Sequence, residues 1–231
     1  MADSDIYASA LLRYPETISN LEEKQEVAAR IAAEAQDGQA IGIGSGSNAY
    51  LTLWAIGRRA AEQGLNIRVS TASLETETAA VTLGLALMPL GSTEVDWGVD
   101  GADEVDPHNR LIKGRGGALF KEKILWKTAR KMYLAVDPSK YVERLGEKFP
   151  VPIEVYPAAA ALLSRELTRL SSREHSLRLG AGKDGPVITE AGNLIIDAWF
   201  DEIPFGLHAE LKGLPGVIET GLFEGFEFEV L

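Results

Sequence analysis

The chain of 231 residues contains no cysteine, which excludes disulfide bonds and thiolate metal sites and is compatible with a reducing compartment. Histidine is also scarce. His108, His175 and His208 are scattered and do not have the spacing of metal ligands. Ser45 has no obvious histidine partner for a nucleophilic triad. We therefore expect no bound metal and no serine–histidine chemistry.

Basic charge is in short supply as well, because 23 Lys and Arg residues face 34 Asp and Glu residues, giving a net charge of −11. Such a surface disfavours nucleic acid as a partner. No apolar run has the length of a membrane span, and the acidic N-terminus lacks the features of a signal peptide. We expect a cytoplasmic protein with no membrane partner. A small anionic substrate is compatible with this charge if a few lysines and backbone N–H groups converge.

What is present is a hydrophobic fraction of 45%, enough for a sizeable core. In the first part of the chain, apolar strand and helix patterns alternate, which predicts a mostly parallel sheet covered by helices. Ser19 to Glu22 has the spacing of a capping box at the start of the first helix. The predicted helices are 21–35, 49–63, 75–82 and 118–130, and the predicted strands are 40–43, 66–70, 86–90, 95–99, 111–112 and 132–136.

The pattern changes at 149–157, where three prolines indicate a domain boundary or an edge strand. Beyond it the sequence predicts a smaller α+β layer with an antiparallel sheet. Its predicted helices are 158–170 and 206–213, and its predicted strands are 177–179, 187–189, 193–199, 217–220 and 226–231.

A glycine-rich turn at 44–48 follows the predicted strand 40–43 and precedes a helix, where free N–H groups suit an anion. Ser47 stands where the dinucleotide fingerprint needs glycine, and no lysine follows Gly46 as a phosphate loop of nucleotide hydrolases requires. Ser45, Ser47 and Asn48 fit a small phosphate or hydroxyl-bearing ligand. A tight turn without a ligand is the alternative.

Asp100 and Asp103 come at the end of a predicted strand, the edge at which open parallel sheets bind ligands. A solvated turn is the alternative here. On the helix that follows, Glu122 shares one face with apolar residues, so its carboxylate should be partly desolvated, as suits a general base. A buried structural glutamate paired with a lysine would give the same pattern. Lys113 precedes a glycine-rich loop and could neutralise an oxyanion, whereas Lys24 lies on a buried helix stripe.

With these residues in view, the chain resembles ribose-5-phosphate isomerase, type A. The similarity spans roughly residues 21–225, and the acidic loop together with the block from Lys113 to Ile124 is its most specific part. The matching segments are 42–47 (GIGSGS), 99–104 (VDGADE), 113–124 (KGRGGALFKEKI), 135–140 (AVDPSK), 149–155 (FPVPIEV), 192–197 (GNLIID) and 221–223 (GLF).

The resemblance implies a cofactor-independent conversion of ribose 5-phosphate to ribulose 5-phosphate through an enediolate. It implies that Glu122 is the base, that Asp100 and Asp103 hold sugar hydroxyls and help to open the ring, and that Lys113 stabilises the enediolate oxygen with the N–H groups of Gly114, Arg115 and Gly116. Phosphate and substrate contacts would come from a set of polar residues: Lys24, Ser45, Gly46, Ser47, Asn48 and Lys140.

The resemblance also implies a mostly parallel, Rossmann-like sheet with an inserted ferredoxin-like α+β domain, and a homodimer or homotetramer. The expected domains are an N-terminal arm (1–20), a catalytic domain (21–146 with 218–231) and a small domain (147–217). Three departures from the family pattern put the exact substrate in question: Arg115 stands where the family usually has glycine, and Ser45 and Asn48 replace the usual threonines.

Two further hypotheses remain. One is a non-catalytic phosphosugar-binding or sensor protein, against which Glu122 argues because binding alone needs no base. The other is an enzyme similar to coenzyme A transferases, in which a glutamate acts as nucleophile.

Overall fold

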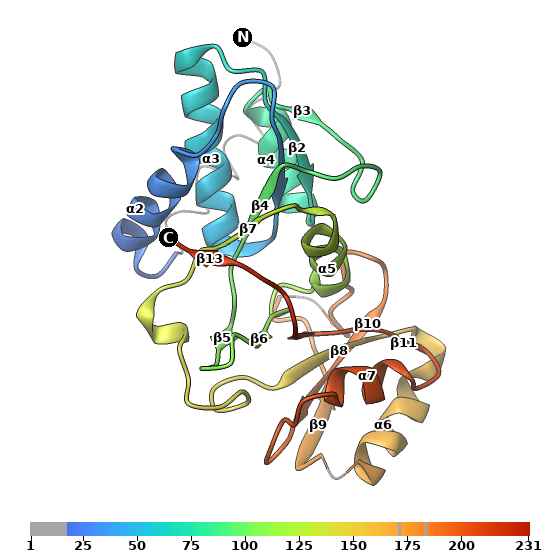
Figure 1. Cartoon of the computed structure of the whole chain (residues 1–231). Helices are drawn as coiled ribbons and strands as arrows, with labels where there is room; N and C mark the ends of the chain where they lie inside the picture. Colours follow the sequence, from blue (N-terminus) through green and yellow to red (C-terminus); the bar gives the residue numbers. More distant parts are fainter. Residues whose placement is uncertain (1–17, 171, 183) are drawn as a thin grey trace. The chain divides into compact units, whose positions relative to one another are not determined.

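The computed structural model describes residues 18–170, 172–182 and 184–231, so nearly all of the predicted N-terminal arm lies outside the described residues. Packing divides the chain into two units (Figure 1). The first consists of the described part of Met1–Gly101 with Ile124–Asp137 and Glu227–Leu231. The second consists of Ala102–Lys123 and Pro138–Phe226. No helix among the described residues is long and apolar enough to cross a membrane.

The first unit is built on a six-stranded sheet in which every neighbouring pair of strands is parallel, in the order β13-β7-β4-β1-β2-β3. Its strands are β1 (Ala40–Ile43), β2 (Arg68–Thr71), β3 (Ala86–Leu87), β4 (Trp97–Asp100), β7 (Met132–Leu134) and β13 (Glu229–Val230). Its helices are α2 (Leu21–Ala32), α3 (Gly46–Gln63) and α4 (Leu74–Thr82), and α5 (Leu119–Thr128) contributes its last turns.

The two faces of this sheet are buried against different helices. On one face, Ile41, Ile43 and Val99 share a core with residues of α2, α3 and α4. On the other face, Ala40 packs with Leu125 of α5. Burial on both faces explains why β1 has the sequence of a continuous apolar run instead of an alternating pattern.

The second unit contains a four-stranded antiparallel sheet in the order β11-β8-β10-β9. Its elements follow the chain as β8, α6, β9, β10, α7, β11, the βαββαβ arrangement of ferredoxin-like folds. The bounds are β8 (Val151–Val155), α6 (Ala160–Arg169), β9 (Glu174–Leu177), β10 (Leu194–Trp199), α7 (Leu207–Lys212) and β11 (Val217–Thr220), with 3-10 turns η2 (Pro138–Lys140) and η3 (Pro157–Ala159). A three-stranded antiparallel sheet, β12-β6-β5, is formed by β12 (Leu222–Phe223), β6 (Leu111–Ile112) and β5 (Glu104–Val105).

The two faces of the four-stranded sheet differ in chemistry. Apolar residues of β8 and β10 pack with α6 and α7 in one core. The register pairs Pro152 with Asp197, and Glu154 with both Ile195 and Glu219, so these alternate residues share the opposite face. This polar face is defined by Glu154, Asp197 and Glu219, and the backbone of Gly114 lies against it at Pro152.

The predicted α/β class, with a mostly parallel sheet flanked by helices and a smaller α+β layer, is confirmed. The predicted domain boundaries do not coincide with the division by packing. Residues 102–123 belong to the second unit, because β5 and β6 pair with each other and β6 pairs with β12. Likewise residues 218–220, which the prediction placed in the catalytic domain, belong to β11 (Val217–Thr220), and β11 pairs with β8.

Several local predictions are wrong. The capping box is absent, because Asn20 is the N-cap in a left-handed conformation (φ 52°) without a side-chain cap. The first helix ends at Ala32 and not at 35, whereas α3 begins three residues before the predicted Ala49. No strand forms at 187–189, and the isolated bridge nearby joins Leu179 to Pro186, just before this segment.

The proline-rich segment is an interior strand and neither a boundary nor an edge. Strand β8 pairs with β10 on one side and β11 on the other. The carbonyl of Pro152 accepts a hydrogen bond from the N–H of Gly221 (2.7 Å), and the N and C=O of one strand residue face the same neighbour. An N–H at position 152 would therefore point toward the side of β11, just beyond Thr220, the last residue of β11. Its absence in proline removes little of the hydrogen bonding between β8 and β11.

Candidate functional site

One group of predicted site residues belongs to the first unit, at the carboxyl ends of β1 and β4. Asp100 ends β4 and is fully buried. Its carboxylate accepts hydrogen bonds from the indole N–H of Trp126 (2.9 Å) and from the backbone N–H of Gly101 (2.9 Å). Trp126, which the sequence analysis did not single out, therefore fixes the orientation of Asp100 at the sheet edge where ligands bind.

Each of the three glycines at the end of β1 and in the turn that follows has its own structural reason. A Cβ at Gly42 would lie 2.5 Å from the side chain of Leu125, and a Cβ at Gly44 would lie 2.2 Å from the carboxyl group of Asp100. Gly46 has a φ of +75°, which favours glycine. Packing and conformation thus account for all three glycines, and Gly44 brings the turn directly against Asp100.

The predicted phosphate residues of the first unit lie at or near the N-terminus of the 18-residue helix α3. Ser45 is the N-cap, and Ser47 and Asn48 lie in the first turn with half-buried side chains. The ammonium of Lys24 donates to the hydroxyl of Ser47 (3.3 Å), and the amide of Asn48 donates to the carbonyl of Ala135 (2.5 Å). A helix N-terminus with an ammonium group beside it is a favourable arrangement for an anion.

The second group belongs to the second unit and contains a buried ion pair. Glu122 lies in the first turn of α5, and Lys113 directly follows β6. Lys113 Nζ is 3.3 Å from Glu122 Oε1, and each side chain is 3% exposed. The backbone N–H of Lys113 donates to the carbonyl of Gly221 (2.9 Å). The predicted carboxylate on an apolar helix face is confirmed, and so is its pairing with a lysine, so these two interpretations are not exclusive.

Asp103 is linked to this pair. Burial raises the pKa of the Asp103 carboxyl group above its ordinary value, and the charge of Glu122 raises it further, whereas Lys113, the N–H of Arg115 and Lys140 act to lower it. The Arg115 N–H donates to Asp103 Oδ2 (3.2 Å). A carboxyl group with a raised pKa exchanges protons with hydroxyl groups more readily near neutral pH.

The side chains of Arg115 and Lys140 both contact the ring of Phe149. The Arg115 guanidinium carbon lies 5.4 Å from the ring centroid and Lys140 Nζ lies 5.6 Å from it. Arg115 is exposed to solvent. Its guanidinium therefore increases the positive charge around the ring that Lys140 contacts.

Sequence reasoning missed the carboxylates on the polar face of the four-stranded sheet. Glu154 accepts hydrogen bonds from Thr189 (2.7 Å) and Asn193 (2.9 Å), and burial raises its pKa. Glu219 pairs with the buried ammonium of Lys123 (3.0 Å). A carboxylate in the middle of an otherwise apolar strand, as Glu154 is in β8, was the sequence signal available.

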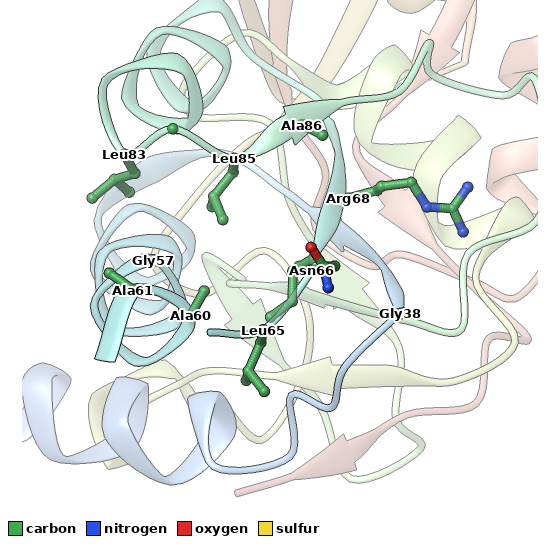
Figure 2. Close-up of a pocket in the computed structure, with 12 residues that line it drawn as sticks. Gly38, Gly57, Ala60, Ala61, Leu65, Asn66, Arg68, Leu83, Leu85 and Ala86 are labelled. Atoms are coloured by element: carbon green, nitrogen blue, oxygen red, sulfur yellow. The ribbon is translucent and has the colours of Figure 1, made fainter. Parts of the chain in front are cut away.

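A pocket of about 390 Å³ in the first unit contains none of the predicted site residues (Figure 2). It is lined mostly by small and apolar residues near the ends of α3 and α4 and the beginnings of β2 and β3. In Figure 2 the side chain of Arg68 extends away from Ala60, Ala61 and Leu85. Since ligands of open parallel sheets bind at the carboxyl ends of the strands, this pocket at the opposite ends is a poor candidate for the substrate site.

A buried carboxylate paired with an ammonium group, with a second carboxyl group of raised pKa nearby, suits an enzyme that moves protons on a polar substrate. Comparison with known proteins shows which family of enzymes the chain belongs to. A family model described as ribose 5-phosphate isomerase A (phosphoriboisomerase A) matches residues 68–231. Ribose-5-phosphate isomerase A of Methanothermobacter thermautotrophicus is 40% identical over 204 residues, which cover 87% of this chain and 89% of that protein. The protein of the same name from Thermosynechococcus vestitus is 42% identical, with 87% and 86% covered.

Solved structures agree with these relatives. Ribose 5-phosphate isomerase A of Methanocaldococcus jannaschii superimposes with a TM-score of 0.87 at 38% identity, covering 92% of this chain and 95% of that one. A D-ribose-5-phosphate isomerase in complex with phospho-erythronic acid also gives a TM-score of 0.87, at 37% identity, covering 92% and 94%. The chain belongs to the ribose 5-phosphate isomerase A family. The resemblance seen in the sequence is confirmed, and the comparisons support neither the sensor nor the coenzyme A transferase hypothesis.

Proposed function

We propose that the chain interconverts ribose 5-phosphate and ribulose 5-phosphate, and that Glu122 is the base that carries the proton. The observation on which the residue assignment depends is the buried carboxylate of Glu122, 3.3 Å from the ammonium of Lys113, in a member of this family. A buried carboxylate with an adjacent cation is the equipment that proton abstraction beside a carbonyl group requires.

In the proposed reaction, Glu122 removes the proton from C2 of the open-chain aldose. The electron pair of the C–H bond forms the C1–C2 double bond, and the carbonyl electrons move to the oxygen on C1, giving an enediolate. The ammonium of Lys113 and the N–H groups of the 114–116 loop stabilise this oxygen. Glu122 then returns the proton to C1, which takes it with the electron pair of the C1–C2 double bond. The proton of the C2 hydroxyl passes to the oxygen on C1, and the electrons of its O–H bond form the C2 carbonyl group of the ketose.

The remaining roles follow the resemblance. Burial raises the pKa of Asp103, and its carboxyl group exchanges protons with a sugar hydroxyl during ring opening. Asp100, oriented by Trp126, holds a second hydroxyl. Lys24, Ser47 and Asn48, at the N-terminus of α3, are proposed phosphate ligands, and Lys140 is another.

The test is Glu122→Gln, assayed with ribose 5-phosphate in the presence of a chelator. We expect kcat to fall by about 10²- to 10⁴-fold, the usual contribution of general base catalysis. Because Glu122→Gln removes one member of a buried ion pair, a second variant, Glu122→Asp, is also assayed. Aspartate keeps the negative charge, but its shorter side chain moves the carboxylate back from the position it has in Glu122. Glu166→Gln, on α6 of the same unit, is the matched control. Normal turnover in Glu122→Gln would refute the assignment of the base.

A further inference from the structure

The loop that follows Lys113 is bound by one arginine side chain. Arg178, directly after β9, donates from Nη1 to the carbonyl oxygens of Gly114 (2.8 Å) and Arg115 (2.9 Å). The same guanidinium donates from Nε to Asp197 Oδ2 (2.7 Å) and from Nη2 to Oδ1. The Arg178 and Asp197 side chains are only 16% and 17% exposed. A planar guanidinium engaged on both sides in this way has one orientation.

The arginine is fixed by the sheet. Asp197 lies in β10, where its backbone is paired with Pro152 on one side and Ser176 on the other. The backbone of Arg178 continues the ladder, since its N–H donates to the carbonyl of Ile195 (2.9 Å). A Cβ at Gly114 would lie 3.4 Å from Pro152, so the loop rests on the same polar face that carries Asp197. The guanidinium therefore connects the loop to a rigid element.

The geometry of the peptide group determines what this connection does. In a planar trans peptide the C=O and N–H groups point in opposite directions. Because the carbonyls of Gly114 and Arg115 both point at Arg178, the N–H groups of the same two peptides, those of Arg115 and Gly116, point away from it. The first of them reaches Asp103 Oδ2 at 3.2 Å. A cation on a carbonyl oxygen also polarises the peptide and strengthens its N–H as a donor.

We infer that the Arg178–Asp197 pair is a positioning device for the isomerisation: by binding two carbonyl groups of the 114–116 loop, it aims the opposite N–H groups at Asp103 and at the developing enediolate oxygen. Arg178 is a positioning residue and touches no reacting atom. The inference rests on the proposed function, since only a reaction that develops negative charge on oxygen needs these donors.

The test compares Arg178→Ala and Arg178→Lys with the control Arg169→Ala, which removes an exposed arginine of α6 in the same unit. We expect kcat of Arg178→Ala to fall about 100-fold, the usual effect of misplacing a catalytic group by about 1 Å, with little change in KM. Lysine keeps the charge but lacks the fork, so Arg178→Lys should recover only part of the loss. Millimolar guanidinium ion should restore Arg178→Ala, whereas equal concentrations of sodium chloride should not.

Two results would overturn the inference. One is an unchanged kcat in Arg178→Ala. The other is a loss that follows the loss of folded protein in urea titrations and that neither guanidinium nor lysine restores, because a merely structural role would behave in that way. Failure of the proposed function is seen separately, as absence of isomerisation by the unaltered protein. In that case amide hydrogen exchange at 115 and 116 still tests the contact, which should lose protection in Arg178→Ala but not in Arg169→Ala.

Discussion

The contact between Gly44 and Asp100 makes the Gly44→Ala substitution a sharp test of how the first unit is built. A Cβ at position 44 would lie 2.2 Å from both Cγ and Oδ1 of Asp100. The carboxylate cannot move aside freely, because Trp126 and the N–H of Gly101 each hold it at 2.9 Å. The added methyl group must therefore displace backbone or break these hydrogen bonds.

The size of the effect follows from these two terms. Inserting a methyl group into a packed interior typically costs about 1–3 kcal/mol. Losing one hydrogen bond to a buried charged group costs about 1.5–3 kcal/mol more. We therefore expect Gly44→Ala to lower the free energy of unfolding by about 2.5–6 kcal/mol. Gly46→Ala, at a glycine with positive φ and no atom within 4 Å of the added Cβ, should cost only about 1–2 kcal/mol for the left-handed backbone.

Urea unfolding followed by circular dichroism measures both variants. The decisive arm repeats Gly44→Ala in an Asp100→Gly background, which removes every side-chain atom that the new Cβ would meet at that residue. Most of the loss should then disappear. An equal loss in both backgrounds, or a Gly44→Ala protein as stable as the unaltered one, would show that the packing argument is wrong.

Other expectations concern two titratable groups, Lys123 and Asp103, and the positive charge of Arg115. Burial lowers the pKa of Lys123 to about 8, below its unfolded value, despite the opposing effect of Glu219. The unfolded chain thus binds more protons between about pH 8 and pH 10.5, and this residue should make stability rise across that range. Urea titrations of the double variant Lys123→Met, Glu219→Leu should lack this rise; an equal slope in both proteins would contradict it. Burial raises the pKa of Asp103, so its charged form is unfavourable in the folded protein at pH 7. Asp103→Asn should therefore be more stable than the unaltered protein at pH 7 but less active, and the difference in stability should shrink toward pH 4. A variant less stable than the unaltered protein at pH 7 would refute this. Arg115→Gly should raise KM for ribose 5-phosphate about threefold without changing kcat, since it removes positive charge beside Lys140. Arg115→Lys keeps the charge and should leave KM unchanged. Equal KM values in Arg115→Gly and the unaltered protein would show that this charge plays no part in binding.

The sequence predicts the parallel sheet well because strands such as β1 are buried on both faces and carry continuous apolar runs. It misses β5 and β12, each two residues long, because two residues carry too little pattern to be distinguished from a turn, although the equally short β6 was predicted. It also misplaces the proline segment. Proline in β8 is tolerated because its missing N–H falls beyond the end of β11, which depends on register and cannot be seen in local sequence.

The candidate site divides in the same way. Glu122 could be found because a charged residue within an apolar pattern is a local signal, and Lys113 because it directly precedes a glycine-rich loop. Trp126 and Arg178 could not, because they act on Asp100 and Gly114 across 26 and 64 residues of chain, through side chains that are unremarkable where they stand. Residues that carry chemistry thus leave a trace in the sequence nearby, whereas residues that hold them in place are revealed by the fold.

The pairing of Glu122 with Lys113 also answers an electrostatic difficulty in the proposed reaction. A carboxylate alone at 3% exposure would be strongly destabilised, and the ammonium at 3.3 Å offsets this. When Glu122 accepts the substrate proton its charge disappears, and at that moment a negative charge develops on the substrate oxygen. The lysine then has a new partner, so the number of charges in the buried site stays constant through the step. A lysine serving only to stabilise the fold would need no such partner. Lys113→Met should therefore lower kcat far more than a second substitution that destabilises the protein equally, and equal effects of the two on kcat would leave Lys113 with a structural role alone.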